Sequence, residues 1–289
     1  MSNSFKADLN QVKQIIEYYS DHQKEVNQTN IYFKASTDDF SVLIYSNLTV
    51  LFQGKKATEE YRKWNKIEES ESINLDTHMG SDEVGCGDYF GPIVVSAALV
   101  EKDDIQYLVD IGVKDSKQLN DSKIQEIAPL IISKIKSATF VLSNKKYNEI
   151  RDGYNLNKVK AYLHNFVLSK LIKKTNYKGK IVVDQFCSKD LFYNYLSDYK
   201  NDEIVDNITF ETKAENKYIA VACASIIARF TFLNEISKLK TETGYNILLG
   251  ADSKVDELAK QILNEKGFDY LKNIVKLHFK NTEKIVGNQ

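Results

Sequence analysis

Residues 80–92 constrain this chain more than any other segment. They place two adjacent carboxylates, Asp82 and Glu83, at the end of a strand-like run and directly before a glycine-rich turn. The apolar run 92–100 that follows predicts a buried strand, which would anchor the acidic turn at the core. Carboxylates bind hard divalent cations, and glycines let the main chain approach a sugar or phosphate closely. The segment therefore favours metal-dependent chemistry on a phosphodiester, although a bare acidic pair is usually a solvated surface feature.

Composition limits the class of protein. With 289 residues, of which 43% are hydrophobic, the chain is long enough and apolar enough for two globular domains. Its formal net charge of -1 gives no global attraction for nucleic acid, so binding of a polyanion would depend on local patches and bound metal ions. The three cysteines show no Cys-x-x-Cys spacing, which fits a reducing cytosol. No signal peptide and no apolar run near the ~20 residues of a membrane span are evident, so we expect a soluble, cytoplasmic monomer without membrane contact.

The first part of the chain predicts a small α+β domain. Helical spacing of apolar residues alternates there with short β-rich runs separated by turn residues. The predicted helices are 9–19 and 58–64, and the predicted strands are 30–35, 40–45 and 48–53. A polar segment rich in Glu and Ser follows. We therefore expect an N-terminal domain at 1–70, a linker at 71–77 and a second domain at 78–289.

The second domain has the mixed pattern of an α/β fold. Its predicted strands are 80–84, 92–100, 138–143, 180–186 and 207–212. Its predicted helices are 121–136, 156–173, 215–239, 255–264 and 269–277. This order predicts a mixed sheet flanked by helices, with an antiparallel hairpin at one side of the sheet.

Two further acids end or begin core elements. Asp184 closes a β-branched strand, and in open α/β sheets sites form at strand ends, so it is placed to face Asp82 across neighbouring strands. Its alternative role is to cap the helix that follows. Glu215 starts an Ala-rich helix, where the helix dipole favours an anion, although a purely structural first-turn glutamate is the commoner case. It is the combination of these acids with Asp82 and Glu83 that favours a site.

Four carboxylates form a suitable set for two Mg²⁺ or Mn²⁺ ions about 3.5 to 4 Å apart. The four histidines show no His-x-x-x-His spacing, so we expect them to be structural and predict no zinc site. Successive strand residues point to opposite faces, so Asp82 and Glu83 share a site only at a frayed or twisted strand end. The glycines that follow permit such an end.

These motifs resemble the prokaryotic type 2 ribonucleases H, and more closely their ribonuclease HIII branch. The resemblance covers nearly the whole chain, and residues 50–54 with Glu60, Lys63 and Trp64 are similar to the end of that family's N-terminal domain. The segments that carry it are 82–92, 113–119, 182–186, 212–215, 221–229 and 276–282.

The resemblance implies an endonuclease that cuts the RNA strand of RNA/DNA hybrids with Mg²⁺ or Mn²⁺, on a ribonuclease H-like fold. It also implies that the N-terminal domain resembles a TATA-binding-protein fold and helps hold the substrate. Asp82, Glu83 and Asp184 carry over as catalytic metal ligands, with Glu215 as the fourth acid. We expect in-line attack by water that leaves a 3′-hydroxyl and a 5′-phosphate.

Hybrid selectivity requires recognition of the 2′-hydroxyl, which distinguishes RNA from DNA. The main-chain groups of the turn at Gly85, Cys86 and Gly87 are candidates for this contact. Cys86 departs from the Gly-Arg-Gly turn of the ribonuclease HII branch, which argues against strong cleavage at a lone ribonucleotide.

A second candidate segment for substrate binding is Asp115, Ser116 and Lys117, which would bring an ammonium group near a phosphate. The alternative is a solvated loop that caps the helix at 121–136. Two rival functions also remain at this stage: a metal-dependent DNA nuclease of the same superfold, and a non-catalytic hybrid-binding protein.

Overall fold

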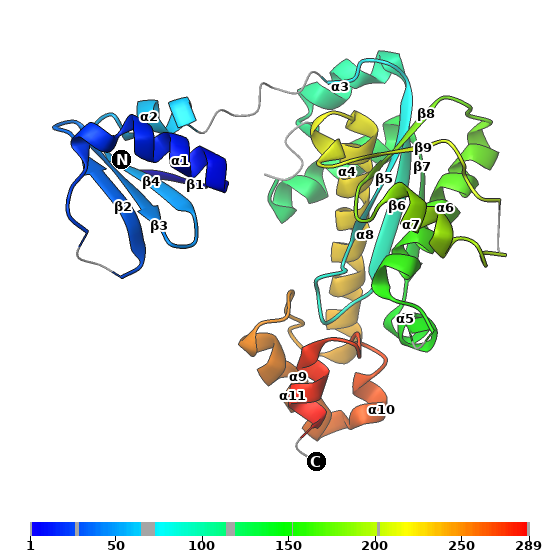
Figure 1. Cartoon of the computed structure of the whole chain (residues 1–289). Coiled ribbons are helices and arrows are strands. Elements are labelled where there is room, and N and C mark those ends of the chain that lie inside the picture. Colours follow the sequence, from blue (N-terminus) through cyan, green and yellow to red (C-terminus); the bar gives the residue numbers. More distant parts are fainter. Residues whose placement is uncertain are drawn as a thin grey trace. The chain divides into compact units, whose positions relative to one another are not determined.

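The computed structural model describes residues 2–26, 29–64, 73–113, 119–151, 153–200 and 203–287. The chain divides into two compact units, Met1–Ser72 and Ile73–Gln289 (Figure 1). The predicted linker, 71–77, falls at this division, and its first two residues lie outside the described residues.

The first unit is a four-stranded antiparallel sheet with two helices. The strands lie in the order β1-β4-β3-β2. Their bounds are β1 (Ser2–Lys6), β2 (Ile31–Ser36), β3 (Phe40–Tyr45) and β4 (Thr49–Gly54), and the helices are α1 (Leu9–Tyr18) and α2 (Ala57–Trp64). The predicted meander of β2, β3 and β4 is found, whereas β1 was not predicted because its sequence holds a single apolar residue. Only pairing with β4, far along the chain, makes it a strand.

One face of this sheet forms the core of the unit. In β2, β3 and β4, two residues on the same side of each strand are buried and alternate with more exposed ones, as a half-buried sheet requires. These residues pack with Val12 and Ile15 of α1 and with Tyr19, which follows it. The Tyr19 hydroxyl contacts the buried Glu60 carboxylate and accepts a hydrogen bond from Trp64 Nε1 at 2.8 Å. Phe52 and Ile44 are fully buried there.

The second unit is built on a five-stranded mixed sheet in the order β7-β6-β5-β8-β9. The strands are β5 (His78–Val84), β6 (Ile93–Val100), β7 (Lys136–Leu142), β8 (Lys180–Asp184) and β9 (Ile208–Glu211). β5, β6 and β7 pair antiparallel, as the predicted hairpin requires, and β5, β8 and β9 pair parallel. The expected mixed sheet is therefore confirmed, and β5 lies at its centre.

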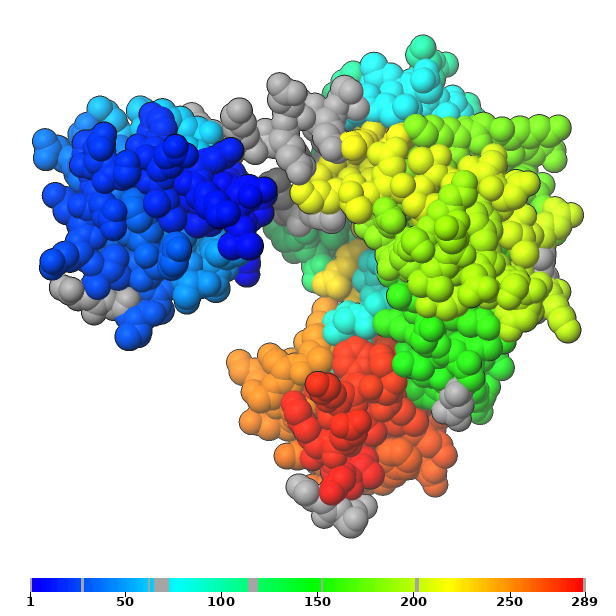
Figure 2. Space-filling model, viewed as in Figure 1, coloured from blue at the N-terminus to red at the C-terminus, as the bar shows by residue number. Residues whose placement is uncertain are grey.

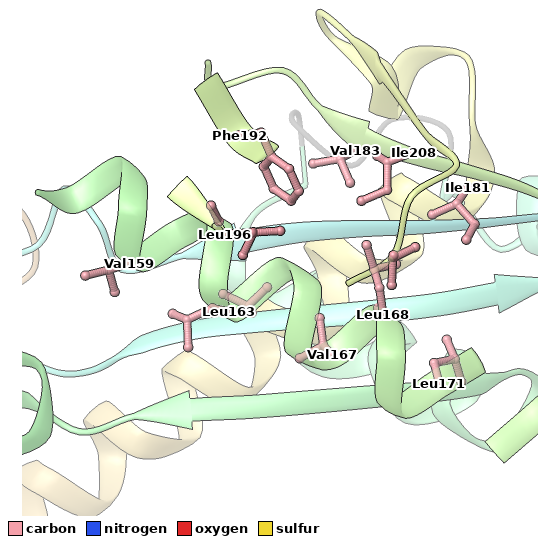
Figure 3. Packing of buried hydrophobic residues seen from close by; sticks show 14 of the residues in the cluster. Val159, Leu163, Val167, Leu168, Leu171, Ile181, Val183, Phe192, Leu196 and Ile208 are labelled. Atoms are coloured by element: carbon pink, nitrogen blue, oxygen red, sulfur yellow. The ribbon is translucent and has the colours of Figure 1, made fainter. Parts of the chain in front are cut away.

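Helices cover both faces of this sheet. On one face, α6 (Leu156–Thr175) packs its apolar side chains against the strands, and Val159, Leu163, Val167 and Leu171 point toward the sheet (Figure 3). On the other face lie α4 (Asp121–Lys134) and α8 (Ile219–Thr243). α8 approaches β5 so closely that a Cβ at Gly80 would lie 2.6 Å from the main-chain nitrogen of Val221. The sheet and α8 therefore meet through glycine and small side chains.

α8 has the length and composition of a helix that could cross a membrane, with a hydropathy of 1.6 over its most apolar window. We expected no segment of this kind from the sequence. However, 61% of that window is buried inside the protein, and the helix packs along β5 and β6. Packing in the core accounts for its apolar character.

Six further α-helices complete the described part of the unit: α3 (Ile105–Asp110), α5 (Asn144–Arg151), α7 (Lys189–Tyr195), α9 (Ser253–Lys266), α10 (Phe268–Leu271) and α11 (Lys280–Val286). Of these, α9, α10 and α11 close one end of the unit (Figure 1). Figure 2 shows the C-terminal residues, in orange and red, lying against the green α5. The predicted helix 269–277 is wrong, because α10 ends at Leu271 and Val275 instead forms a β-bridge with Phe90. The predicted helix 215–239 begins late: residues 214–216 form a 3₁₀ turn, and α8 starts at Ile219.

Candidate active site

Asp82 and Asp184 lie at the corresponding ends of two neighbouring strands of the sheet. β5 and β8 are parallel neighbours, with Ser81 opposite Val183, so the next residue of each strand is an aspartate. The pKa of Asp82 is raised to about 7, first by burial and then by repulsion from the carboxylates of Glu83 and Asp184. A hydrogen bond from the Ser225 side chain of α8 acts in the opposite direction. Negative charge is therefore concentrated at this strand end.

The turn that carries Glu215 is hydrogen-bonded to the carboxylate of Asp184 through the main chain. The N–H of Ala214 donates to Asp184 Oδ1 at 3.0 Å, so the carboxylate of Asp184 holds the 3₁₀ turn that carries Glu215. Lys213 enters this turn with a φ of 54°, the left-handed region, which makes the bend tight. The Glu215 residue is 4% exposed. Asp184 and the Glu215 turn therefore form one connected acidic corner.

Glu83 is held from the other face of the sheet. Its carboxylate forms an ion pair with Lys160 Nζ, and His164 Nε2 lies 2.9 Å from Glu83 Oε2. Burial would raise the pKa of Glu83, but the contacts with His164 and Lys160 outweigh it and lower the pKa to about 2. Both partners belong to α6. Glu83 is therefore an ionised carboxylate directed toward α6.

The two adjacent acids of β5 thus diverge, as strand geometry requires. Asp82 contacts Ser225 of α8, and Glu83 contacts Lys160 and His164 of α6. Within the described ranges, no group of three or more His, Cys, Asp or Glu side chains is gathered closely enough to hold a metal ion. The donor set nevertheless fits a hard cation, because a cation near Asp82 and Asp184 would pair with carboxylates whose ionisation burial and mutual repulsion disfavour.

A groove with a volume of about 340 Å³ opens beside the end of β5. It runs between α4 and α8, and Arg229 at its side forms a bidentate pair with Asp121 at 3.0 and 3.1 Å. Its lining residues are Glu83, Val84, Leu119, Asp121, Ile124, Ser225, Ile226 and Arg229. Of the four candidate acids, Glu83 lines this groove.

The glycine turn after β5 has a fixed conformation. Gly85 has a φ of 94°, and a Cβ there would lie 2.3 Å from the carbonyl oxygen of Pro92, so only glycine fits. Gly87 has no atom within 4 Å of where its Cβ would be, so its main chain borders open space. Cys86 is partly buried, and burial, followed by the charge of Glu83, raises the pKa of its thiol to about 12. Cys86 is therefore a neutral thiol and not a nucleophile.

The C-terminal segment clamps this turn. Lys276 is fully buried, and its Nζ donates to the carbonyl oxygens of Asp88 at 2.7 Å and Gly91 at 2.5 Å. Burial lowers the pKa of Lys276 to about 8. From the same end of the unit, the N–H of Gly250 donates to Asp88 Oδ1 at 2.6 Å. The turn is therefore held in place by residues more than 150 positions along the chain.

Comparison with known proteins decides the family. The Ribonuclease HII family model matches residues 79–282, and a domain of unknown function, DUF3378, matches residues 4–75. The chain is 40% identical over 262 residues to a ribonuclease HIII of Geobacillus sp. (strain WCH70), with 87% of each chain covered. It is 38% identical over 286 residues to a ribonuclease HIII of Streptococcus agalactiae serotype III, with 96% of each chain covered. This chain belongs to the ribonuclease HIII family.

Solved structures agree with this assignment. The crystal structure of Bst-RNase HIII in complex with Mn²⁺ superimposes with a TM-score of 0.72 and 36% identity, covering 100% of this chain and 99% of the other. Ribonuclease H2 from Pyrococcus horikoshii OT3 gives a TM-score of 0.62 and 28% identity over 73% of this chain and 98% of the other. The predicted fold is therefore confirmed. Ribonuclease HIII is a divalent-metal-dependent endonuclease that hydrolyses the RNA strand of RNA/DNA hybrids.

Sequence reasoning did not find every residue that contacts the acids of this ribonuclease HIII. The sequence predicts a structural role for His164, and its motifs indicate neither Lys160 nor Ser225 as a partner of the acids. The spacing of Lys160 and His164, four residues apart on one helix face, was the available signal. The predicted substrate-binding segment Asp115, Ser116 and Lys117 lies outside the described residues.

Proposed function

We propose that this ribonuclease HIII cleaves the RNA strand with Mg²⁺ or Mn²⁺ held by four carboxylates, those of Asp82, Glu83, Asp184 and Glu215. The observation that carries the proposal is the meeting of Asp82 and Asp184 at the ends of two neighbouring parallel strands. Burial, then the charge of Glu83 and, least, that of Asp184 raise the pKa of Asp82 to about 7, so this strand end suits a cation. When bound, the cations lower the pKa of the attacking water and stabilise the leaving oxygen. The family's dependence on a divalent metal supports this reading.

The chain itself supplies orientation. Ser225 and the N–H of Glu83 hydrogen-bond to Asp82, and the N–H of Ala214 hydrogen-bonds to Asp184, so both carboxylates keep fixed directions. Water attacks the phosphorus, the bond from phosphorus to the 3′-oxygen breaks, and that oxygen takes up a proton. The products carry a 3′-hydroxyl and a 5′-phosphate.

Selection of RNA is assigned to the glycine turn. Gly85, Cys86 and Gly87 follow the acids directly, and the main chain at Gly87 borders open space. A main-chain N–H or carbonyl group there is suited to the 2′-hydroxyl of the strand being cut, because a 2′-hydroxyl both donates and accepts. Asp115, Ser116 and Lys117 stay a prediction as contacts to a phosphate.

We further propose that the first unit helps hold the hybrid. Tyr32 on β2 is 68% exposed, and Lys34 on the same strand is half-buried. An exposed aromatic ring beside a cation suits a nucleic-acid surface. We also propose that the protein acts as a cytoplasmic monomer without membrane contact.

One assay tests this function against its rivals. Three duplexes of the same sequence are offered in turn: an RNA/DNA hybrid, a DNA duplex with one ribonucleotide, and an all-DNA duplex. We expect cleavage of the hybrid with Mg²⁺ or Mn²⁺, none of the all-DNA duplex, and loss of all cleavage with EDTA. Cleavage of the all-DNA duplex would favour the DNA nuclease, and hybrid binding without cleavage would favour the non-catalytic binding protein.

A further inference from the structure

Lys160 and His164 lie one helical turn apart on α6, and both contact the carboxylate of Glu83. Lys160 Nζ pairs with Oε1, and His164 Nε2 lies 2.9 Å from Oε2. Each oxygen of Glu83 therefore has its own donor, and the two donors come from one rigid helix. This arrangement fixes the plane of the carboxylate as well as its position.

Both donors are themselves held in place. His164 is fully buried, and its Nδ1 lies 2.8 Å from the Ser81 hydroxyl, so a ring that carries hydrogen on Nε2 alone meets both contacts. The Phe186 ring contacts both donors: its centroid lies 5.3 Å from that of the His164 ring, on which it stacks, and 4.1 Å from Lys160 Nζ. Phe186 follows Asp184 by two residues. The network therefore links β5, α6 and the end of β8.

Packing alone does not explain these residue types. Burial of an ammonium group costs free energy unless it is paired, and an apolar pair on α6 would cover β5 without that cost. Lys160 is 9% exposed and is buried against an acid that the family resemblance assigns to the metal site. A carboxylate oxygen accepts more than one hydrogen bond, so Glu83 can keep both donors and still offer a lone pair to a cation. The network is therefore compatible with metal binding.

We propose that Lys160 and His164 are positioning residues, which fix the direction of the Glu83 carboxylate so that it can serve the metal site. This inference rests on the proposed role of Glu83 as a metal ligand. Neither residue touches the reacting atoms. Their contribution is to orient a ligand, as hydrogen-bond partners of metal ligands do in other metal sites.

The direction in which the affinity for Mn²⁺ changes distinguishes a positioning role of Lys160 from a purely electrostatic effect of its charge. Lys160 carries a positive charge near a cation site, so the loss of that charge alone would tighten the binding of Mn²⁺. The loss of an orienting contact weakens binding, typically by about 10-fold or more. If Lys160 had only a structural role, its substitution would change neither the affinity of the protein for Mn²⁺ nor the extent to which that affinity depends on Glu83.

The experiment is calorimetric titration of the full-length, metal-free protein with Mn²⁺. We expect Lys160→Met to raise the Kd by about 10-fold and Lys160→Arg, which keeps the charge and the donors, to restore much of the affinity. Lys158→Met is the matched control, because Lys158 lies on the same helix but pairs with Asp198 at 2.8 Å. We expect that control to bind Mn²⁺ as the wild type does.

A second pair of variants tests His164 without a change of charge at Lys160. We expect His164→Leu to weaken Mn²⁺ binding about 10-fold and His164→Gln, whose amide can donate from the place of Nε2, to bind more tightly than His164→Leu. Circular dichroism and the melting temperature of the metal-free variants report whether each one folds. If one of the two breaking variants does not fold, the other still decides.

The outcomes distinguish this inference from the function on which it rests. Unchanged or tighter Mn²⁺ binding in Lys160→Met and His164→Leu overturns the positioning role, provided that Glu83→Gln weakens binding. Unchanged binding in Glu83→Gln overturns the assignment of Glu83 as a ligand instead. Weaker Mn²⁺ binding in Lys160→Met, His164→Leu and Glu83→Gln, with Lys160→Arg and His164→Gln intermediate, supports both.

Discussion

The carboxylate of Asp184 accepts a hydrogen bond from the main-chain N–H of Ala214 at 3.0 Å. This bond joins the end of β8 to the 3₁₀ turn that carries Glu215, so the third and fourth acids of the proposed site move as one piece. The geometry also makes Asp184 suitable for a clean substitution, because an asparagine keeps an oxygen that can accept the same N–H.

Asp184→Asn should abolish cleavage while the fold persists. We expect the rate of hybrid cleavage with saturating Mg²⁺ to fall by about 10³-fold or more, because the variant removes a charge that the cations require. Binding of the hybrid, measured by fluorescence anisotropy, should persist. Asp198→Asn is the control, since Asp198 is a surface partner of Lys158 and should leave the rate unchanged. Normal cleavage by Asp184→Asn would reject the proposed role.

Gly85→Ala should destabilise the protein and reduce its activity. The new Cβ would meet the Pro92 carbonyl oxygen at 2.3 Å, and the φ of 94° strains any side chain, so we expect a loss of about 3 kcal/mol in the free energy of unfolding. Gly112 has a φ of 98° with nothing within 4 Å, so Gly112→Ala carries the strain without the collision and should cost about 1 to 2 kcal/mol. If urea unfolding shows the same loss of free energy of unfolding in Gly85→Ala and Gly112→Ala, the contact with Pro92 is unimportant.

Gly87→Ala should affect substrate binding and not stability. A Cβ there meets no atom within 4 Å, so we expect the free energy of unfolding to change by less than about 0.5 kcal/mol. If the main chain at Gly87 approaches the sugar of the RNA strand, the added methyl group should raise the KM for the hybrid several-fold. Gly153, which is also open, supplies the control substitution. An unchanged KM in steady-state cleavage would remove Gly87 from the proposed contact.

His78 should make stability depend on pH. The Nδ1–H of the buried ring donates to the Asp76 carbonyl oxygen at 2.7 Å, and Nε2 accepts the N–H of Ala220 at the start of α8 at 3.0 Å. A proton on Nε2 would turn this acceptor into a donor facing another donor. Burial, and to a lesser degree the charge of Lys180, lowers the pKa of His78 below 6.5, whereas the backbone contact with Asp76 raises it.

The direction of this pH dependence follows from the linkage between proton binding and folding. Because the pKa of His78 is lower in the folded protein than in the unfolded chain, the unfolded chain binds more protons as the pH falls below about 6.5. The contribution of His78 is therefore fully present above that pH and declines toward the lower folded pKa. In His78→Gln, the free energy of unfolding should fall less between pH 7.5 and 5.5 than in the wild type. His22→Gln, at an exposed histidine, should keep the wild-type slope.

Tyr32→Ser tests the first unit as a substrate surface. The side chain is 68% exposed, so its loss should barely change stability, whereas the loss of stacking should raise the KM for the hybrid about 5-fold or more with an unchanged kcat. Leu9→Ser on α1 is a control of similar exposure, 64%. A KM that rises equally in both variants would mean that the effect is not specific to the Tyr32 surface.

Several strands and helices of the fold were predictable from local patterns in the amino-acid sequence. β-branched runs predicted β6 and β8, and the 3.6-residue spacing predicted α6, because burial on one face leaves these periods in the sequence. The strand β1 and the structure of the C-terminal segment were not predictable in this way. β1 becomes a strand only through pairing with β4, and residues 272–279 are kept from a helix by the bridge between Phe90 and Val275.

The acids at the ends of β5 and β8 and the glycine-rich turn after β5 were predictable from the amino-acid sequence, because the pattern of a strand and the place where it ends are local properties of the chain. The directions in which those acids point depend on the packing of the folded protein. Asp82 is directed toward Ser225 and Glu83 toward Lys160 and His164, since side chains alternate along a strand and each face meets a different helix. No spacing along the chain specifies which helix covers which face.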